Sequence, residues 1–180
     1  MDINRTLRQI AAGNTQAFAE VVEHYQRPLF GFLSRLGLSP AVCEELAQET
    51  FLRCWSHLAE YDPKCGAFST WLFTIARNLA LSELTRSSRR CDISDDALAD
   101  TVCDHPHPEM SLALEQQRDR LCMAMSQLSA ADRCLIALVY MDGFKLSEIA
   151  AIEQSSTGVI KTRLFRARSR LYKLLEKADA

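Results

Sequence analysis

Hydrophobic positions recur with a helical period along most of the chain. Between residues 18 and 36 the apolar side chains stand three or four positions apart, which predicts an amphipathic helix with one buried face. That face consists of Phe18, Val21, Val22, Tyr25, Leu29, Phe32, Leu33 and Leu36. Pro28 lies inside the run, and because proline has no backbone N–H we expect it in a first turn or at a break.

Start signals mark the next helices. Ser39 and Pro40 predict the N-cap and first position of a second helix that reaches about Leu58. A polar loop follows, and a third long helix is predicted over residues 69–87.

A second block of helices is predicted between residues 111 and 177. Ser129 and Asp132 resemble a capping box, and Gly143 suits the left-handed conformation that ends a helix. A short helix from Ser147, a polar turn at residues 154–156 and a long final helix complete this block.

Charge is distributed unevenly, although the 180-residue chain has a formal net charge of only −2. Between Lys161 and Lys173 the final helix carries six cations and no acid: Lys161, Arg163, Arg166, Arg168, Arg170 and Lys173. The third helix carries Arg77, Arg86, Arg89 and Arg90 against Glu83, whereas residues 92–109 hold six acidic residues and no lysine or arginine. Two basic patches on separate helical blocks favour nucleic-acid phosphate as a partner over plain solvated helix faces.

The composition and these patterns together predict an all-α protein. Glycine and proline are few, and residues of high helix propensity dominate long windows. We predict two small helical domains joined by an acidic linker: residues 1–90, a linker at 91–110, and a second domain at 111–180.

The final helix predicts a DNA-reading surface. On a helical wheel its apolar residues fall within an arc of about 100°; they are Ile160, Leu164, Ala167, Leu171, Leu174 and Leu175. The opposite face is cationic and polar around one aromatic ring, with Arg163 on a flank; its members are Thr162, Phe165, Arg166, Ser169 and Lys173. With the short helix before it, this is the helix-turn-helix arrangement, and an ordinary helical hairpin is the alternative.

The first domain shows two further surfaces on the wheel. In the second helix Cys43, Ala47, Phe51, Cys54 and Leu58 point inward, while Leu46 and Leu52 stand among charged residues on the other side. That mixture predicts either a protein-docking surface or packing of both leucines against a neighbouring helix. In the third helix Arg77 and Asn78 point outward ahead of the basic tail, which predicts contact with a DNA backbone or unpaired bases, or a solvated helix end.

Other chemistry is not expected. Seven cysteines without a CxxC pair argue against a disulfide scaffold or zinc finger, so most should be buried apolar groups. Cys103, His105 and His107 have metal-ligand spacing but lie in the linker, where incidental polar residues are the alternative. No acid–base pair, nucleophile triad, signal peptide or membrane-length apolar run is visible. We therefore expect a cytoplasmic non-enzyme without metal or cofactor.

Three motifs carry a resemblance to a known family. ELAQETFLRCW at residues 45–55, FSTWLFTIARNLA at 68–80 and EIAAIEQSSTGVIKTRLFRAR at 148–168 resemble bacterial RNA polymerase sigma factors of the extracytoplasmic-function (ECF) group. The resemblance implies a protein that binds core RNA polymerase and directs it to promoters, for a stress or envelope response. It also implies an anti-sigma protein as a partner; the alternative function is a stand-alone helix-turn-helix regulator.

The resemblance assigns roles to three groups of residues. Polymerase binding is expected on the second helix, at Glu45, Leu46, Gln48, Glu49 and Leu52. Recognition of the −10 element is expected on the third helix, at Arg77, Asn78, Ser82, Arg86, Arg89 and Arg90. Recognition of the −35 element is expected on the final helix, at Lys161, Thr162, Arg163, Phe165, Arg166 and Ser169.

The sequence departs from the family at the helix-turn-helix turn. Glu153, Gln154 and Ser155 replace a Leu-Gly-apolar run, so that Gln154 stands where glycine tolerates positive φ. The expected consequence is an altered turn geometry. Ser82 stands where family members often have Asp or Asn, so the −10 base preference does not transfer.

Overall fold

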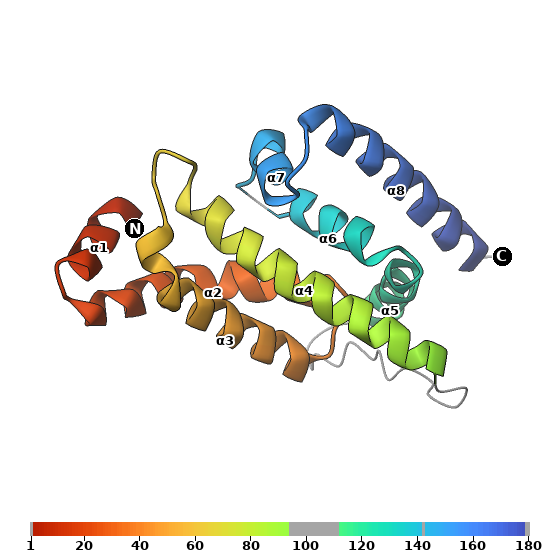
Figure 1. Ribbon diagram of the computed structural model, residues 1–180. Helices are drawn as coiled ribbons and strands as arrows, with labels where there is room; N and C mark the ends of the chain where they lie inside the picture. The colour runs from red at the N-terminus through yellow and green to blue at the C-terminus, as the bar shows by residue number, and fades with distance from the viewer. Residues whose placement is uncertain (1, 94–111, 142, 179–180) are drawn as a thin grey trace.

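Helices form every regular element of the described part of the chain. The computed structural model describes residues 2–93, 112–141 and 143–178, with the side chains of residues 89–93, 112–115 and 178 outside that description. The elements are α1 (Ile3–Ala11), η1 (Thr15–Ala17), α2 (Phe18–Ser34), α3 (Pro40–Ser56), η2 (Leu58–Glu60), α4 (Phe68–Ile93), α5 (Leu112–Ser126), α6 (Ala130–Val139), α7 (Leu146–Ile152) and α8 (Thr157–Ala178) (Figure 1). The predicted all-α class is confirmed.

Local caps begin two of these helices where the sequence predicted them. The Ser39 Oγ accepts the Val42 backbone N–H at 3.4 Å before α3, and the Ser129 Oγ accepts that of Asp132 at 3.2 Å before α6. Each bond satisfies one of the donors left unpaired in a first helical turn.

The prediction of a break at Pro28 is wrong, because α2 continues through it. Proline removes one backbone hydrogen bond from a helix interior and costs about 3 kcal/mol. Here α2 buries Val21, Leu29, Phe32 and Leu33. Tertiary burial of this apolar stripe on both sides of Pro28 therefore outweighs a local preference.

Helix α4 is longer than predicted and occupies the first residues of the proposed linker, up to Ile93. The remainder of that segment, including Cys103, His105 and His107, lies outside the described residues. At the other end of the chain, α1 was not predicted; Asp2 caps it, and the Thr6 hydroxyl donates to Glu20 of α2 at 3.0 Å.

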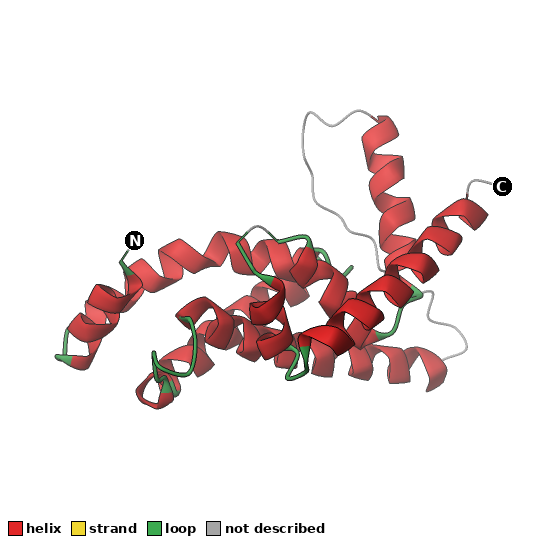
Figure 2. Cartoon of the chain, turned by 90° about the horizontal axis from the view of Figure 1, so that it is seen from above, coloured by secondary structure: helices red, strands yellow, loops and turns green. Residues whose placement is uncertain are grey.

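The two halves of the molecule share one core. Helices α6 and α7 lie along α4, with α2 and α3 on its other side and α8 outermost (Figures 1 and 2). Phe73 of α4 packs edge-to-face against Phe144 with centroids 5.0 Å apart, and Phe73, Ala76 and Ala80 belong to the same buried cluster as Leu138, Ile149 and Ile152. The second half is therefore docked on the helix predicted to meet the −10 element.

Candidate nucleic-acid and polymerase interfaces

The turn between α7 and α8 closes with a left-handed residue. Gln154 has a φ of +52°; its N–H donates to the Ala151 carbonyl at 3.1 Å, and the Ser155 N–H donates to that of Ala150 at 2.9 Å. These two bonds form a Schellman motif, in which glycine is the usual left-handed residue. A tight helix-turn-helix turn is thus retained without glycine, at the expense of backbone strain at Gln154.

Helix α8 presents the predicted DNA-reading face to solvent. Phe165 is 73% exposed, and Lys161, Thr162, Arg166 and Ser169 are exposed around it. On the opposite side Ile160 and Ala167 are buried, and Leu164, Leu171, Leu174 and Leu175 are partly buried. The wheel prediction for this helix is confirmed.

Contacts within the second half fix the orientation of that face. The Arg168 guanidinium lies 5.4 Å from the centroid of the Tyr140 ring, a cation–π distance that ties α8 to the end of α6. The N-terminus of α8 is capped by the Ser156 Oγ, which accepts the Val159 N–H at 3.3 Å. The exposed ring and cations are therefore carried on a rigid helix rather than on a loop.

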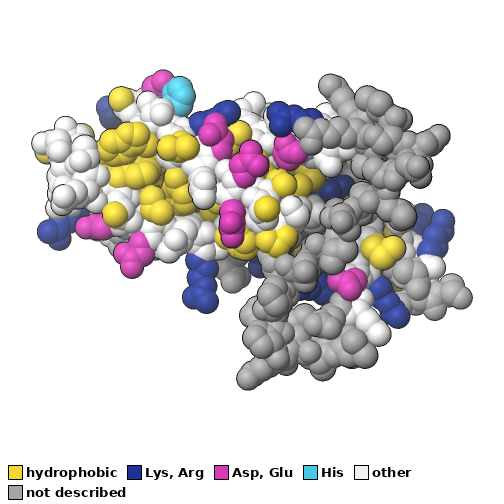
Figure 3. Space-filling model, turned by 90° about the horizontal axis from the view of Figure 1, so that it is seen from below, with side chains coloured by type: hydrophobic (Ala, Val, Ile, Leu, Met, Phe, Trp, Pro, Cys, Tyr) yellow, Lys and Arg dark blue, Asp and Glu magenta, His cyan; other side chains and the backbone are white. Residues whose placement is uncertain are grey.

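A groove between α3 and α4 unites two sets of predicted residues. Its volume is about 490 Å³; it is lined from α3 by Glu45, Leu46, Gln48, Glu49, Leu52 and Arg53, and from α4 by Asn78, Leu79, Ser82, Glu83 and Arg86. Two ion pairs form part of this lining, Arg53 to Glu49 at 2.6 Å and Arg86 to Glu83 at 3.0 Å. The face of the molecule seen from below carries acidic side chains among hydrophobic ones (Figure 3). Candidate polymerase and −10 contacts thus lie side by side.

Neither of the two alternatives for the leucines of α3, an exposed docking surface or packing against a neighbouring helix, holds for both residues. Leu46 is 7% exposed and belongs to the shared core, whereas Leu52 is 62% exposed. The buried face of α3 consists of Cys43, Leu46, Thr50 and Cys54. Relative to the predicted inward face, it is rotated about the helix axis toward Leu46. Leu46 supports the surface from beneath, and Leu52 is the apolar group on it.

Glu153 is a buried acid between two of the predicted DNA-binding arginines. Its side chain has no exposed surface; Oε1 accepts from Arg77 Nε at 2.9 Å, and Oε2 accepts from Arg77 Nη2 at 3.2 Å and from Arg163 Nη1 at 2.9 Å. Arg163 also lies 3.6 Å from Asp132. The Arg77 side chain is only 14% exposed, so the prediction that it points outward is wrong. The two partners of this ion pair lie far apart in the sequence. A helical wheel compares only residues of the same helix, so it could not predict the pair.

One signal in the sequence pointed to the burial of Glu153. It stands four positions after Ile149, on the face of α7 that also buries Ile152, and helical residues four apart share a face. A buried carboxylate requires charged partners, because isolated burial of a charge is very unfavourable.

Burial raises the pKa of two cysteine thiols, Cys54 and Cys134. Burial raises the pKa of the Cys54 thiol to about 12. Burial, reinforced by the nearby Glu153 carboxylate, likewise raises the pKa of Cys134 to about 12 against the opposing effect of the arginines. Cys43 is also buried, whereas Cys65 is exposed. The prediction that most cysteines are core residues holds for these three, and Cys65 departs from it.

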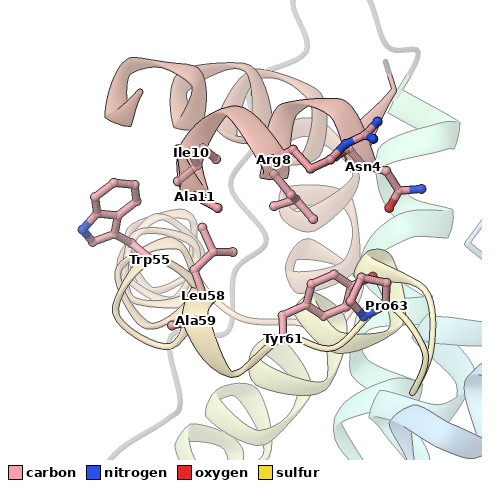
Figure 4. Close-up of a pocket in the computed structure, with 10 residues that line it drawn as sticks. Asn4, Arg8, Ile10, Ala11, Trp55, Leu58, Ala59, Tyr61 and Pro63 are labelled. Carbon is pink, nitrogen blue, oxygen red and sulfur yellow. The ribbon is translucent and has the colours of Figure 1, made fainter. Parts of the chain in front are cut away.

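Another pocket, of about 920 Å³, lies between α1 and the α3–η2 corner (Figure 4). Its lining is mostly apolar, with the rings of Trp55 and Tyr61 on one side and Ile10 of α1 on the other. None of its lining residues was predicted to bind DNA or polymerase. Within the described residues no group of His, Cys, Asp and Glu side chains is arranged to hold a metal ion, and no helix is long and apolar enough to cross a membrane.

Two family models match the two halves. Sigma-70 region 2 matches residues 21–90, and sigma-70 region 4 matches residues 118–171. These matches fall on the α3–α4 half and on the helix-turn-helix half, respectively. The side chains of Arg89 and Arg90, at the end of the first match, lie outside the described residues.

Similar proteins cover almost the whole chain. An ECF RNA polymerase sigma factor RpoE from Cereibacter sphaeroides is 32% identical over 155 residues, covering 86% of this chain and 84% of that protein. SigW of Bacillus subtilis, another ECF sigma factor, is 29% identical and covers 97% of both chains. The co-crystal structure of the sigma factor RpoE with the anti-sigma factor NepR from Bartonella quintana has a TM-score of 0.69 and 31% identity, over 88% of this chain and 96% of that one.

An all-α chain with a helix-turn-helix half and a region 2 half is the architecture of a transcription initiation factor. The chain belongs to the ECF group of the sigma-70 family of RNA polymerase sigma factors. It is a promoter-directing sigma factor that acts with core RNA polymerase, and the stand-alone regulator is not favoured.

Proposed function

We propose that the α3–α4 groove is the polymerase-docking surface and that it passes directly into the surface for the −10 element. Glu45, Gln48, Glu49 and Leu52 supply acidic, amide and apolar contacts for polymerase, and Asn78, Ser82 and Arg86 approach the DNA strand. The observation that supports this best is the shared lining of one groove by both sets. A polymerase surface seated there would hold the melted strand against α4.

Recognition of the −35 element is proposed for the outer face of α8. Lys161 and Arg166 offer hydrogen-bond donors to phosphates and guanine, and the Phe165 ring offers an apolar edge to a thymine methyl. Thr162, Arg163 and Ser169 complete the set. The exposure of Phe165 supports this role, because an aromatic ring is more stable when it is buried against a partner than when it is in contact with water.

Regulation by an anti-sigma protein is proposed as well. The support is a structural relative that was crystallised in complex with an anti-sigma factor and that matches both halves of this chain. We propose that the protein works in the cytoplasm, performs no chemistry itself and serves a stress or envelope response; the basis is its membership of the ECF group.

Transcription in vitro tests these assignments. Purified chain with core RNA polymerase should start transcripts at defined sites on genomic fragments, whereas the chain alone should bind the same fragments weakly. A Glu45→Ala/Gln48→Ala variant should lose most co-purification with polymerase and keep its helical circular-dichroism signal. The matched control is Glu60→Ala, an exposed acid beyond the end of α3, which should co-purify normally. Equal co-purification of both variants would show that the docking surface lies elsewhere.

A further inference from the structure

Arg163 differs from the other proposed −35 residues in what surrounds its charge. Its side chain is 28% exposed; Nη1 donates to Glu153 Oε2 at 2.9 Å, and Nη2 lies 3.6 Å from Asp132 Oδ1. Lys161 and Arg166 are exposed, and neither pairs with a carboxylate within the described part of the chain. The Arg163 guanidinium is therefore directed to two acids of its own half.

The two acids make Arg163 an unfavourable position for a DNA phosphate. A phosphate bound there would lie close to both carboxylates, and like charges repel. With Arg77, which also binds Glu153, the four side chains have no net charge, so they offer phosphate no net attraction. The Glu153 side chain has no exposed surface, so water does not screen the repulsion on that side.

The Arg163 guanidinium joins three helices near the start of the reading helix. Asp132 lies in the first turn of α6, Glu153 directly follows α7, and Arg163 lies in the second turn of α8. The three helices pack against one another (Figure 1). The two pairs of Arg163 therefore link α8 to both of the helices that precede it.

Apolar packing and these charged pairs hold α8 in different ways. Ile160 is buried with Ile149 and Ile152, and Ala167 is buried with Ile136. Burial of apolar surface keeps α8 attached to its neighbours but is non-directional. Hydrogen bonds between a guanidinium and a carboxylate are strong and directional. The charged pairs are therefore suited to fix how far α8 is rotated about its own axis.

The rotation of α8 decides which of its atoms face the DNA. Successive residues of a helix are about 100° apart, so Phe165 and Arg166 have set angular positions relative to Arg163. A hydrogen bond to a base edge requires about 2.7–3.2 Å between its heavy atoms. A small rotation of α8 would therefore weaken several base contacts at once.

We propose that Arg163 is a positioning residue: it does not touch promoter DNA, and its pairs with Glu153 and Asp132 fix the rotation of α8 that presents Phe165 and Arg166 to the −35 element. This inference rests on the proposed function, because it requires that the outer face of α8 reads the −35 element. Within that set it gives Arg163 a part other than contact. The family resemblance places leucine at position 153, so the pair with Glu153 comes from this chain's own turn.

Residual dipolar couplings of the backbone amides test the positioning without DNA or polymerase. These couplings report the orientation and rotation of α8 relative to α6 and α7 in the full chain. Asp132→Asn and Arg163→Gln should each rotate α8 and keep the helical circular-dichroism signal of the wild type. Val21→Ala, which removes buried methyl groups from a cluster of the first half, is the control for lost stability and should leave α8 in place. If neither variant of the pairs moves α8, the inference is refuted.

Base preference of the holoenzyme tests the consequence for reading, on promoters mapped by transcription in vitro. A single substitution in a site typically weakens specific binding about 5- to 150-fold. Arg163→Gln, Asp132→Asn and Glu153→Gln should all reduce this discrimination at several −35 positions together, although Glu153 is buried and cannot reach DNA. A direct base contact by Arg163 would instead relax one position and leave Asp132→Asn like the wild type. Because Glu153 also binds Arg77, a proposed −10 residue, its variant is compared only at −35 positions.

Salt dependence of the same binding separates positioning from a phosphate contact. Lys161→Gln, which removes an expected phosphate contact, should lower the slope of log K against log salt by about one. Arg163→Gln should weaken binding and keep the slope of the wild type. If Arg163→Gln lowers the slope by that amount, Arg163 contacts a phosphate and the inference is overturned.

These measurements distinguish the inference from the proposed function. A wild-type holoenzyme without preference at any −35 position refutes the proposed role of α8. A wild-type preference that all three variants of the pairs retain refutes the positioning alone. If Glu153→Gln loses helical content, Asp132→Asn carries the comparison, because its side chain is partly exposed and the Glu153 pairs stay intact.

Discussion

The left-handed turn residue makes the sharpest stability prediction. Gln154 has a φ of +52°, a region that costs an L-residue with a Cβ about 1–2 kcal/mol and costs glycine almost nothing. Gln154→Gly removes this strain and adds about 0.4–1 kcal/mol of backbone entropy to the unfolded chain. We therefore expect a net gain of roughly 0.5–1 kcal/mol in the free energy of unfolding, which is a rise of about 2–4 °C or less in Tm for a chain of this size.

The assay compares three substitutions at this one position. Urea unfolding followed by circular dichroism should rank Gly as most stable, Asn as intermediate because its short side chain tolerates the left-handed region, and Ala as least stable. The Gln154 side chain is exposed, so none of the three changes removes core packing. If the glycine variant is no more stable than the alanine variant, the left-handed φ at position 154 does not strain the folded chain, and the prediction is wrong.

Three further predictions follow from which side chains are buried and which are exposed. Leu46→Ala should destabilise the protein by about 2–5 kcal/mol, whereas Leu52→Ala should change stability by less than about 0.5 kcal/mol yet weaken polymerase binding in a pull-down assay. Phe165→Ala should relax −35 base preference by about 1–3 kcal/mol in holoenzyme binding to promoter variants, and an unchanged preference would argue against the reading face. The pKa of Cys54 and Cys134 is about 12, above the ordinary 9.0, so their contribution to stability is fully present below pH 9 and is lost as the pH rises toward 12. The urea midpoint should therefore fall between pH 8 and 10, and fall less in a Cys54→Ala/Cys134→Ala variant.

Features that depend on neighbouring residues were predicted correctly. The caps at Ser39 and Ser129 and the two faces of α8 involve interactions within a turn or two of helix, and those interactions are set by side-chain type and spacing. The exposure of Phe165 and Arg166 followed from the same spacing. The motifs also predicted the family.

The failures involve residues whose environment is supplied from elsewhere in the chain. Pro28 is tolerated because the stripe around it is buried, and Leu46 is buried because α3 packs against α2 and α4. Neither effect is visible from the local period, which places residues around a helix axis but does not say where the neighbouring helices lie.

The sequence by itself therefore indicated the helices other than α1, the two faces of α8, the two basic patches and the resemblance to the sigma-70 family. Only the tertiary structure decided that the two halves share a core and that Arg77 points to Glu153, 76 positions away, rather than to solvent. The physical reason is the range of the interactions: helix propensity, capping and amphipathic spacing act over a few residues, whereas a buried charge takes its partner from whichever segment packs against it.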